Sequence, residues 1–361
     1  MLKILFYLAQ EYYWPSLKPV YDAFATNEEI ELFINIDKNS KRYFKIFLVS
    51  QRGKIEKKFV DQGYQVTREE KGFDAVFCGA QIKNPHRFGD ALLCNVDHGP
   101  GIKTLRYRHF LKQPDTQYIC FLEGPYRVEK FKKYGLDKIE KIYDVGLPKL
   151  DVFFNGHFDK DELVKKYNLD PAKKTILYAP SYKPTSIFMI GEQICRLAEQ
   201  YNVIVKLHPY SWNGKYAPHS QHELFEKLQT RFPYMRLVAE SSHDIMPYMF
   251  VADTMISDGS SVINEFLSLG RCGIIVDLED DALKHSDGQP LLEDRSSDWL
   301  KDSFVHISDA EQLQDAIEQA LNPSPARKKN IEKDKNYIFS FTDGNAAVRV
   351  KEKTLELLNR R

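Results

Sequence analysis

The sequence predicts an α/β protein with two domains, each built on a parallel β-sheet whose faces are covered by helices. Short apolar strands alternate with helical segments along the chain, an order that is typical of parallel sheets. The chain has 361 residues, more than one hydrophobic core usually holds, so two domains are expected. We place them at residues 1–150 and 151–340, and we expect residues 341–361 to form a helix that can pack back on the first domain.

The clearest strand, helix, strand unit lies at residues 255–277, which read MISDGSSVINEFLSLGRCGIIVD. Its two strands are expected to be parallel, so the polar turn 257–261 between the first strand and the helix lies at the carboxyl edge of the sheet, where ligands of open α/β sheets bind. The helix start has free N–H groups and a positive dipole end, which makes Ser260 and Ser261 candidates for holding a phosphate. The alternative is that Asp258 or Ser260 only caps the helix.

The other elements follow the same alternation. In the first half we expect strands at 2–9, 44–49, 66, 73–78, 92–96 and 118–122, with helical or polar pieces at 15–24, 54–63 and 124–134. Gly146 and Pro148 mark the crossing into the second domain. There we expect strands at 175–179, 203–207, 236–238 and 272–276, and helices at 159–167, 191–201, 222–232, 245–251, 310–321 and 345–358.

Composition excludes several classes of protein. Acidic and basic side chains number 51 each, so the chain lacks the basic field of a general nucleic-acid binder, and an anionic ligand must be met by a local site. No cysteine or histidine motif with metal-ligand spacing is present, no cofactor is expected, and the acidic run 277–281 is interpreted as a solvated loop. No apolar stretch approaches the roughly 20 residues that span a bilayer.

The cysteines and the N-terminus point to the cytoplasm. The five cysteines are odd in number and widely spaced, as expected for reduced core residues: Cys78, Cys94, Cys120, Cys195 and Cys272. The apolar run 4–9 is too short for the core of a signal peptide. We therefore expect a cytoplasmic protein, with peripheral attachment to the inner face of the membrane left open.

A histidine follows the strand 92–96 directly, within the segment 97–103, which reads DHGPGIK. A histidine where a strand stops, followed by glycines that let a ligand approach the backbone, is suited to chemistry, although a half-buried surface turn is the alternative. A basic cluster comes next: Lys103, Arg106, Arg108, His109 and Lys112. Such a run is either a solvated face or a surface that receives an anionic acceptor or a lipid headgroup.

The strand 203–207 in the second half runs into His208. Lys206 and His208 share one face of this strand end because strand side chains alternate. Nitrogen donors at the carboxyl edge are costly when buried without a partner, so a bound anion is expected there, with a structural ion pair as the alternative.

Four pieces have now accumulated in order: His98-Gly99 with Lys103, the segment Tyr178-Ala179-Pro180-Ser181, the segment Lys206-Leu207-His208-Pro209, and Ser257-Asp258-Gly259-Ser260-Ser261-Val262 followed by Glu265-Phe266. Together they resemble the CDP-glycerol glycerophosphotransferase family, the polymerases and primases of teichoic acids and related capsular polymers. The similarity covers most of the chain after about residue 92 and touches residues 12–17. The chain departs from the family at Asp97, where a tryptophan is frequent, and at Gly259, where an aromatic residue is frequent.

The resemblance implies a GT-B-like architecture, in which two Rossmann-like domains face a central cleft. It implies transfer of glycerol phosphate or a related polyol phosphate from a CDP-activated donor to a hydroxyl of a cell-surface polymer or lipid-linked acceptor, with release of CMP. By resemblance, His98 is the base for the acceptor hydroxyl and His208 contacts the donor phosphates. The donor side further includes Lys206, Asp258, Gly259, Ser260, Ser261, Glu265, Pro180 and Ser181, and the acceptor side includes Gly99, Lys103 and Arg106.

Two other functions use the same kind of fold. A nucleotide-sugar glycosyltransferase or a sugar-nucleotide epimerase also seats a diphosphate at a helix start. A protein that binds a nucleotide or a polymer without turnover is the third reading. Release of CMP separates the first function from the glycosyltransferase, which releases a nucleoside diphosphate.

Overall fold

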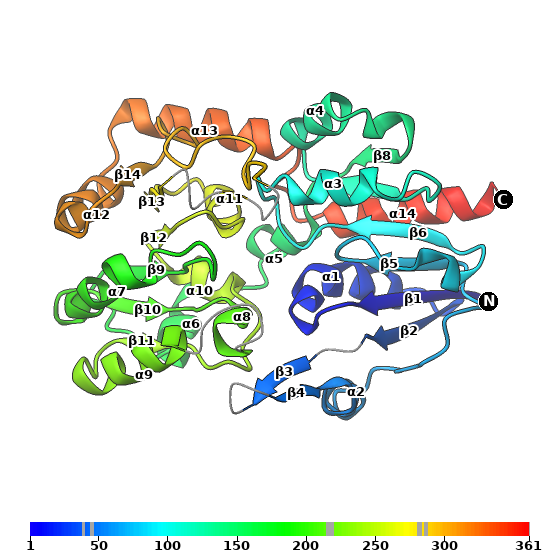
Figure 1. Ribbon diagram of the computed structural model, residues 1–361, viewed down its shortest axis with the longest axis horizontal. Coiled ribbons are helices and arrows are strands. Elements are labelled where there is room, and N and C mark those ends of the chain that lie inside the picture. The colour runs from blue at the N-terminus through cyan, green and yellow to red at the C-terminus, as the bar shows by residue number, and fades with distance from the viewer. Residues whose placement is uncertain (38–39, 44–46, 214–219, 280–283, 285–287, 361) are drawn as a thin grey trace.

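Two six-stranded parallel sheets form the centre of the protein, one in each half of the chain (Figure 1). The structure, a computed structural model, describes residues 1–37, 40–43, 47–213, 220–279, 284 and 288–360. The first sheet has the order β2-β1-β5-β6-β7-β8 and the second the order β11-β10-β9-β12-β13-β14. All pairings within both sheets are parallel. The predicted α/β class is therefore confirmed.

The strands of the two large sheets are short and mostly buried, as apolar parallel strands should be. Those of the first sheet are β1 (Leu2–Leu8), β2 (Ile30–Ile36), β5 (Ala75–Cys78), β6 (Leu92–Val96), β7 (Ile119–Leu122) and β8 (Lys141–Asp144). Those of the second sheet are β9 (Thr175–Tyr178), β10 (Asn202–Val205), β11 (Arg236–Leu237), β12 (Thr254–Ser257), β13 (Ile274–Val276) and β14 (Val305–Ile307).

Helices connect the strands and cover the sheets (Figure 1). In the first half they are α1 (Trp14–Ala25), α2 (Arg52–Asp61), α3 (Leu105–Leu111) and α4 (Pro125–Lys133). The second half has α5 (Asp151–Phe154), α6 (Lys160–Lys166), α7 (Ile187–Arg196), α8 (Pro209–Asn213), α9 (Ser220–Arg231), α10 (Met246–Val251), α11 (Val262–Leu267), α12 (Leu313–Leu321) and α13 (Pro325–Ile338). The last helix, α14 (Ala346–Asn359), returns to α1, and its Ala347 and Val350 join the core of the first sheet.

Two predictions for the first half are wrong. The apolar run 44–49 does not join the parallel sheet: β4 (Phe47–Ser50) pairs antiparallel with β3 (Ser40–Tyr43) in a separate hairpin, and residues 44–46 lie outside the described part of the chain. The side chains at the start of β4 are exposed rather than buried, with 61% for Phe47, 55% for Leu48 and 45% for Val49. Position 66 contributes only an isolated bridge to Ile34 of β2, a strand that the pattern had not revealed.

Both sheets contain a switch point, where the chain changes the direction in which it adds strands. In the first sheet this point lies between β1 and β5, and in the second it lies between β9 and β12. Loops that leave neighbouring strands there diverge to opposite sides and open a crevice at the carboxyl edge. Two such edges therefore define where a ligand can bind.

The five cysteines, all in the described part of the chain, are buried thiols that form no disulfide. Among the described helices, none has both the length and the apolar character needed to cross a membrane.

Candidate active site between the two sheets

A cavity of about 370 Å³ lies where the carboxyl edges of the two sheets meet. Its walls come from the loops after β1, β5 and β6 on one side and after β9, β10 and β12 on the other. Both histidines singled out in the sequence line it, together with Gly99, Lys103, Arg106, Pro180, Ser181, Lys206, Gly259, Ser260, Ser261 and Glu265. A second cavity of about 600 Å³ adjoins it and shares Tyr12, Pro209, Tyr210 and His243 with it.

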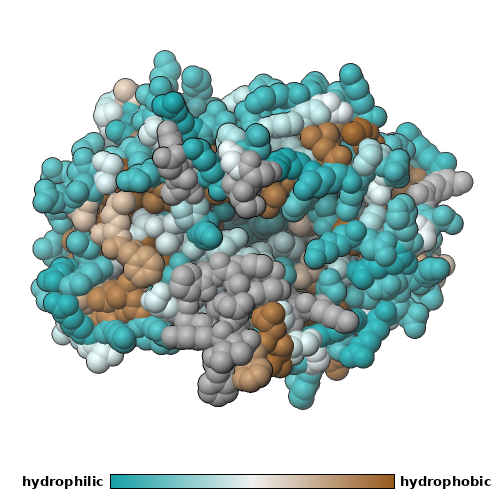
Figure 2. All heavy atoms as spheres, in the orientation of Figure 1, coloured by the Kyte–Doolittle hydropathy of each residue, from teal (hydrophilic) through white to brown (hydrophobic). Residues whose placement is uncertain are grey.

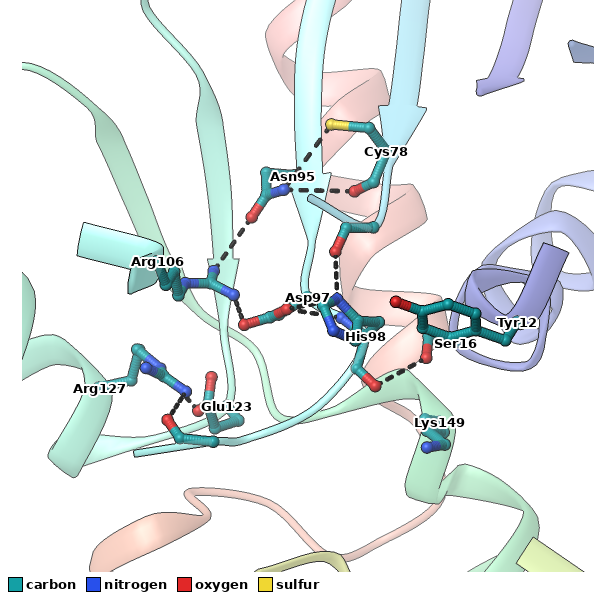
Figure 3. Close-up of polar contacts among 12 residues, drawn as sticks. Tyr12, Ser16, Cys78, Asn95, Asp97, His98, Arg106, Glu123, Arg127 and Lys149 are labelled. Carbon is teal, nitrogen blue, oxygen red and sulfur yellow. Dashed lines mark hydrogen bonds and ion pairs between the residues drawn. The ribbon is translucent and has the colours of Figure 1, made fainter. Parts of the chain in front are cut away.

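His98 lies directly after β6, and its environment fixes which ring nitrogen carries the proton. Nδ1 is 2.8 Å from the carbonyl oxygen of Gly79, and because a carbonyl only accepts, Nδ1 must hold the hydrogen. Nε2 is then the nitrogen that can accept a proton. The ring of Tyr13 stacks on the imidazole, with 4.4 Å between the ring centroids. Ser16 Oγ donates to the His98 carbonyl (Figure 3).

The protein environment makes His98 a weak base on its own. The side chain keeps 37% of its surface open, yet protein surrounds the rest of the ring. Desolvation, followed by the nearby charges of Lys149 and Lys103, lowers the pKa of His98 to about 4, against the opposing effects of the Gly79 carbonyl and Glu265. His98 is therefore neutral at pH 7.

His208 follows β10 and has the opposite tautomer. The backbone N–H of Tyr210 donates to its Nδ1 at 3.1 Å, so in the neutral ring Nε2 carries the hydrogen. Desolvation and the charges of Lys103 and Lys206 hold the pKa of His208 well below its usual value. The cavity thus contains one imidazole that can accept a proton and one that can donate a hydrogen bond.

Two lysines supply positive charge to the cavity. Within the described residues, no carboxylate forms an ion pair with Lys103 or Lys206. Burial lowers the pKa of Lys206 to about 8 and also lowers that of Lys103. A buried cation without a carboxylate partner favours an anionic ligand, as expected for Lys206 and His208 from the strand pattern.

The turn after β12 divides into a part that faces the cavity and a part that does not. Ser260, Ser261 and Gly259 line the cavity, and no side chain caps α11, so the capping alternative does not hold. Asp258, expected on the donor side, lies behind the wall. Its carboxylate accepts from Ser181 N at 2.6 Å and from Ser186 N and Oγ, which ties the loop after β9 to the turn.

Gly99 and Glu265 hold the two halves of the chain together at the cavity. A Cβ on Gly99 would lie 2.6 Å from Ser261 Oγ, so only glycine allows this approach. Both carboxylate oxygens of Glu265 are 2.9 Å from Lys149 Nζ, a lysine that the sequence did not single out. The ion pair is buried, and it joins the crossing segment to α11.

The basic cluster predicted after His98 does not stay together. Arg106 points inward, where it pairs with Asp97 and donates to Asn95 Oδ1 (Figure 3). His109 lies at the rim of the cavity and Lys112 is exposed. Arg106 is therefore a largely buried residue of the cavity wall.

Tyr12, in the segment 12–17 that the resemblance includes, lies between the two histidines and lines both cavities. Its ring lies 6.1 Å from that of His98 and 5.6 Å from that of His208, and its hydroxyl is 3.4 Å from Tyr210 Oη. No sequence pattern marks it, because it comes from a short turn after β1 that only the fold brings to the cavity.

A metal centre is not indicated by the side chains that the structure describes: no group of three or more histidines, cysteines or carboxylates is placed to hold an ion. Asp277 of the acidic run accepts from His306 Nδ1 at 2.9 Å, and positions 280 and 281 lie outside the described residues.

The sequence profile of the family described as CDP-glycerol:poly(glycerophosphate) glycerophosphotransferase matches residues 120–356, about two thirds of the chain. The chain belongs to this family. It is 25% identical over 233 residues to a teichoic acid poly(ribitol-phosphate) polymerase of Bacillus spizizenii, covering 60% of this chain and 34% of that protein. It is 24% identical over 285 residues to a teichoic acid ribitol-phosphate primase of the same organism, covering 76% of this chain and 66% of the primase. The chain thus spans about a third of the polymerase.

Solved structures show the same architecture. The wall teichoic acid polymerase TagF aligns with a TM-score of 0.68 at 14% identity, covering 99% of this chain and 89% of that chain. The complex of Staphylococcus aureus MnaA with UDP aligns with a TM-score of 0.60 at 12% identity, over 99% and 97% of the two chains. At these identities the likeness concerns the fold, and it confirms the GT-B-like arrangement that the resemblance to the glycerophosphotransferase family implied.

Proposed function

We propose that this chain transfers a polyol phosphate from a CDP-activated donor, CDP-glycerol or a related CDP-polyol, to a hydroxyl of a cell-surface polymer or lipid-linked acceptor. CMP is the leaving group. The observation that carries the proposal is the pair of histidines with opposite tautomers beside two lysines without carboxylate partners, in a chain of the glycerophosphotransferase family.

On the acceptor side, Nε2 of His98 takes the proton of the attacking hydroxyl. The acceptor oxygen forms a bond to the phosphorus of the polyol phosphate while the bond from that phosphorus to the CMP oxygen breaks. Two phosphate groups bound beside His98 would raise its pKa from about 4 toward neutrality, because nearby negative charge favours the imidazolium. Binding of the donor would therefore make His98 a stronger base.

On the donor side, fixed positive groups stabilise the charge that develops on the leaving phosphate. Lys103 and Lys206 supply charge, and Nε2–H of His208 supplies a directed hydrogen bond. The hydroxyls of Ser260 and Ser261 add donors at the cavity wall, whereas the backbone N–H of Ser260 already donates to the carbonyl of Asp258. This set can support bond breaking without a divalent cation.

The fold alone also suits a glycosyltransferase, so the released nucleotide is the decisive measurement. Purified protein is incubated with CDP-glycerol, CDP-ribitol and a panel of nucleotide sugars, each with and without a synthetic lipid-linked polyol-phosphate acceptor, and the nucleotides are separated by chromatography. We expect CMP from a CDP-polyol, dependent on acceptor. Release of a nucleoside diphosphate would establish glycosyl transfer, and donor binding without release would establish a binding protein.

We also propose that the boundaries at residues 150 and 340 separate functional domains. We further propose that the chain works in the cytoplasm, at the inner face of the membrane. The exposed apolar side chains of β4 support a membrane contact, since hydrophobic atoms reach the surface where Figure 1 places the β3–β4 hairpin (Figure 2). Helix α2 lines the same cavity as the start of β3 and carries Lys54, Lys57 and Lys58. Lys57 pairs with Asp61 and Lys58 with Glu11, so Lys54 is the lysine of this helix best suited to an anionic lipid surface.

The membrane contact is tested by co-sedimentation with vesicles of anionic lipid. Replacing Phe47 and Leu48 with Ser should reduce the bound fraction at least about threefold, because two exposed apolar side chains each contribute about 1–2 kcal/mol on insertion. The same replacement at Tyr234, which is 77% exposed on the second half, is the control and should leave binding unchanged. Equal binding by both variants would remove the hairpin from this role.

A further inference from the structure

The residue before His98 is Asp97, and each oxygen of its carboxylate contacts a different partner. Asp97 is only 6% exposed, and its Oδ1 accepts the backbone N–H of His98 at 2.7 Å. The same oxygen lies 3.2 Å from Nδ1 of the imidazole. The other oxygen pairs with Arg106 of α3, so the carboxylate has no freedom to rotate (Figure 3).

The guanidinium of Arg106 is also held by a residue of the sheet, Asn95. Its Nη2 donates to Asn95 Oδ1 at 3.0 Å, and the Asn95 amide donates to the carbonyl of Cys78 at 3.4 Å. Asn95 lies on β6 and Cys78 on β5, both fully buried. The guanidinium Nε has no partner within the described residues, so the position of Arg106 depends on Asp97 and Asn95.

This chain of contacts acts on the proton of His98. The Nδ1–H group lies between two acceptors, the Gly79 carbonyl at 2.8 Å and Asp97 Oδ1 at 3.2 Å. Neither atom donates, so both favour the tautomer with the proton on Nδ1 and Nε2 free to act as a base. Because Arg106 neutralises the carboxylate, Asp97 is suited to orienting the ring rather than to taking its proton.

We propose that Asp97, fixed by Arg106 and Asn95, is a positioning residue that holds His98 in the tautomer and orientation needed for it to act as the general base. The inference rests on the proposed function for its effect on turnover, whereas the tautomer itself can be measured without any substrate. Asp97 lies at the wall of the same cavity, and its proposed effect on the reaction runs through the imidazole, whose Nδ1 is 3.2 Å from Asp97 Oδ1.

The charges around His98 must be considered together. From its own segment and α3 these are Asp97, Lys103 and Arg106, and from the crossing segment and the second half they are Lys149, Glu265, Lys206 and His208. Among these charged groups, Asp97 is the one with an atom within 4 Å of Nδ1, and Arg106 pairs with Asp97. Variants of Asp97 and Arg106 therefore change the proton-bearing side of the ring and leave the donor side in place.

The first measurement follows the tautomer of His98 by ¹⁵N NMR on histidine-labelled protein. Wild type should show a protonated Nδ1, and Asp97→Asn should shift a large part of the population to protonated Nε2, since an amide can present its NH₂ group to Nδ1. Asp144→Asn, which removes a carboxylate at the end of β8 in the same sheet, is the matched control and should leave the tautomer unchanged. An unchanged tautomer in Asp97→Asn overturns the proposal.

The second measurement uses pH profiles of kcat for CMP release. Asp97→Asn should lower kcat about 10²-fold at an unchanged KM for the CDP-polyol, because the base is misplaced while donor contacts persist. Removing the carboxylate should move the acid limb to lower pH, and Arg106→Gln, which leaves the carboxylate unpaired, should move it to higher pH by about 0.5 to 1 unit. If Asp97 and Arg106 had only a structural role, neither substitution would shift the acid limb of the pH profile.

The outcomes separate the two proposals. CMP release by wild type together with a kcat of Asp97→Asn within threefold of wild type overturns the positioning role. A shifted tautomer in a protein whose wild type releases no CMP supports the positioning role and overturns the proposed function. If Arg106→Gln does not fold, the tautomer measurement on Asp97→Asn decides alone.

Discussion

At the scale of single residues, the reactivity of the cavity depends on where two imidazole protons reside. A carbonyl oxygen fixes the proton of His98 on Nδ1, and a backbone N–H fixes that of His208 on Nε2. Desolvation and the charges of the neighbouring lysines lower the pKa of both imidazoles, so both rings are neutral at pH 7. The groups that face Nδ1 of each ring therefore determine which histidine can serve as the base.

Replacing His98 with Ala should lower kcat about 10²- to 10⁴-fold, the usual effect of losing a general base. The affinity for a CDP-polyol, measured by calorimetry, should stay within about twofold because the donor contacts lie on the second half of the chain. His86→Ala, at an exposed histidine that does not line the cavity, is the control. Activity of His98→Ala within about threefold of wild type, a change under 1 kcal/mol, would remove this residue from the role of base.

Lys206 should make donor binding depend on pH. Its pKa of about 8 means that the ammonium is fully charged below pH 7 and is lost as pH rises through 8, so CDP affinity should fall about tenfold between pH 7 and pH 9.5. Lys206→Arg should flatten this dependence and keep affinity high, because a guanidinium stays charged. Lys206→Met should flatten it at low affinity. A wild-type affinity that does not vary with pH would contradict the charge assigned to this lysine.

At the scale of elements, the turn between β12 and α11 contains serines that line the cavity and an aspartate that fixes the turn to a neighbouring loop. Ser260 and Ser261 face the cavity, whereas Asp258 behind them binds the loop after β9 through three hydrogen bonds. The turn is therefore held in place by a buried carboxylate, and its serines remain available to a ligand.

Replacing Ser260 and Ser261 together with Ala should weaken CDP binding by about 1–2 kcal/mol, since two hydroxyl donors are lost while the backbone N–H groups remain. The melting temperature should stay close to that of wild type, because neither side chain caps α11. Calorimetric titration of CDP and a melting curve on the same protein give both numbers. A lowered melting temperature at unchanged CDP affinity would make this stretch a purely structural turn.

The positions of strands could be predicted from the sequence where both faces of the strand are buried. Strands β9, β10, β12 and β13 are apolar runs bounded by polar turns, and parallel packing buries both of their faces, so their places could be predicted. The β3–β4 hairpin was mistaken for a sheet strand because its apolar side chains face outward. Helix α13 was missed because it is rich in charge, although Ser324 caps it and Pro325 begins it, which are signals that can be recognised.

The site was predicted less completely than the strands. Motif positions such as His98, His208 and Ser260 could be found because each follows an apolar strand directly. Lys149 and Tyr12 could not, since their partners come from distant parts of the chain and no local spacing connects them. Asp258 and Arg106 were placed on the ligand side, but their charges are satisfied internally. Sequence patterns indicate which residues can react, and only packing determines where they point.

At the scale of the whole molecule, the proposed catalytic groups are divided between two sheets that touch at a few close points. His98 belongs to the first sheet, and His208 with the serine turn belongs to the second. Gly99 lies against Ser261, and Asn264 Nδ2 donates to the Pro100 carbonyl, so the loop after β6 rests directly on the turn before α11. The distance between base and donor therefore depends on how closely the two halves approach.

Gly99→Ala should separate the halves, because the added Cβ would lie 2.6 Å from Ser261 Oγ and 3.0 Å from its Cβ. We expect kcat to fall at least about tenfold, since displacement of catalytic groups by about 1 Å is costly. CDP affinity should change less than kcat. Gly53→Ala in α2, where an added Cβ meets nothing within 4 Å, is the matched control. Steady-state kinetics on both variants test this, and equal kcat values would show that the contact at Gly99 is not needed.

The return of α14 to the first sheet also bears on how the protein is made. Ala347 and Val350 fill a core whose other members, such as Phe6 and Phe77, are synthesised hundreds of residues earlier. On the ribosome this core therefore lacks Ala347 and Val350 until the entire second half has been translated. The second sheet, whose strands all lie between residues 175 and 307, can finish folding before the first one does. The core whose strands are made first would then be the last to be completed.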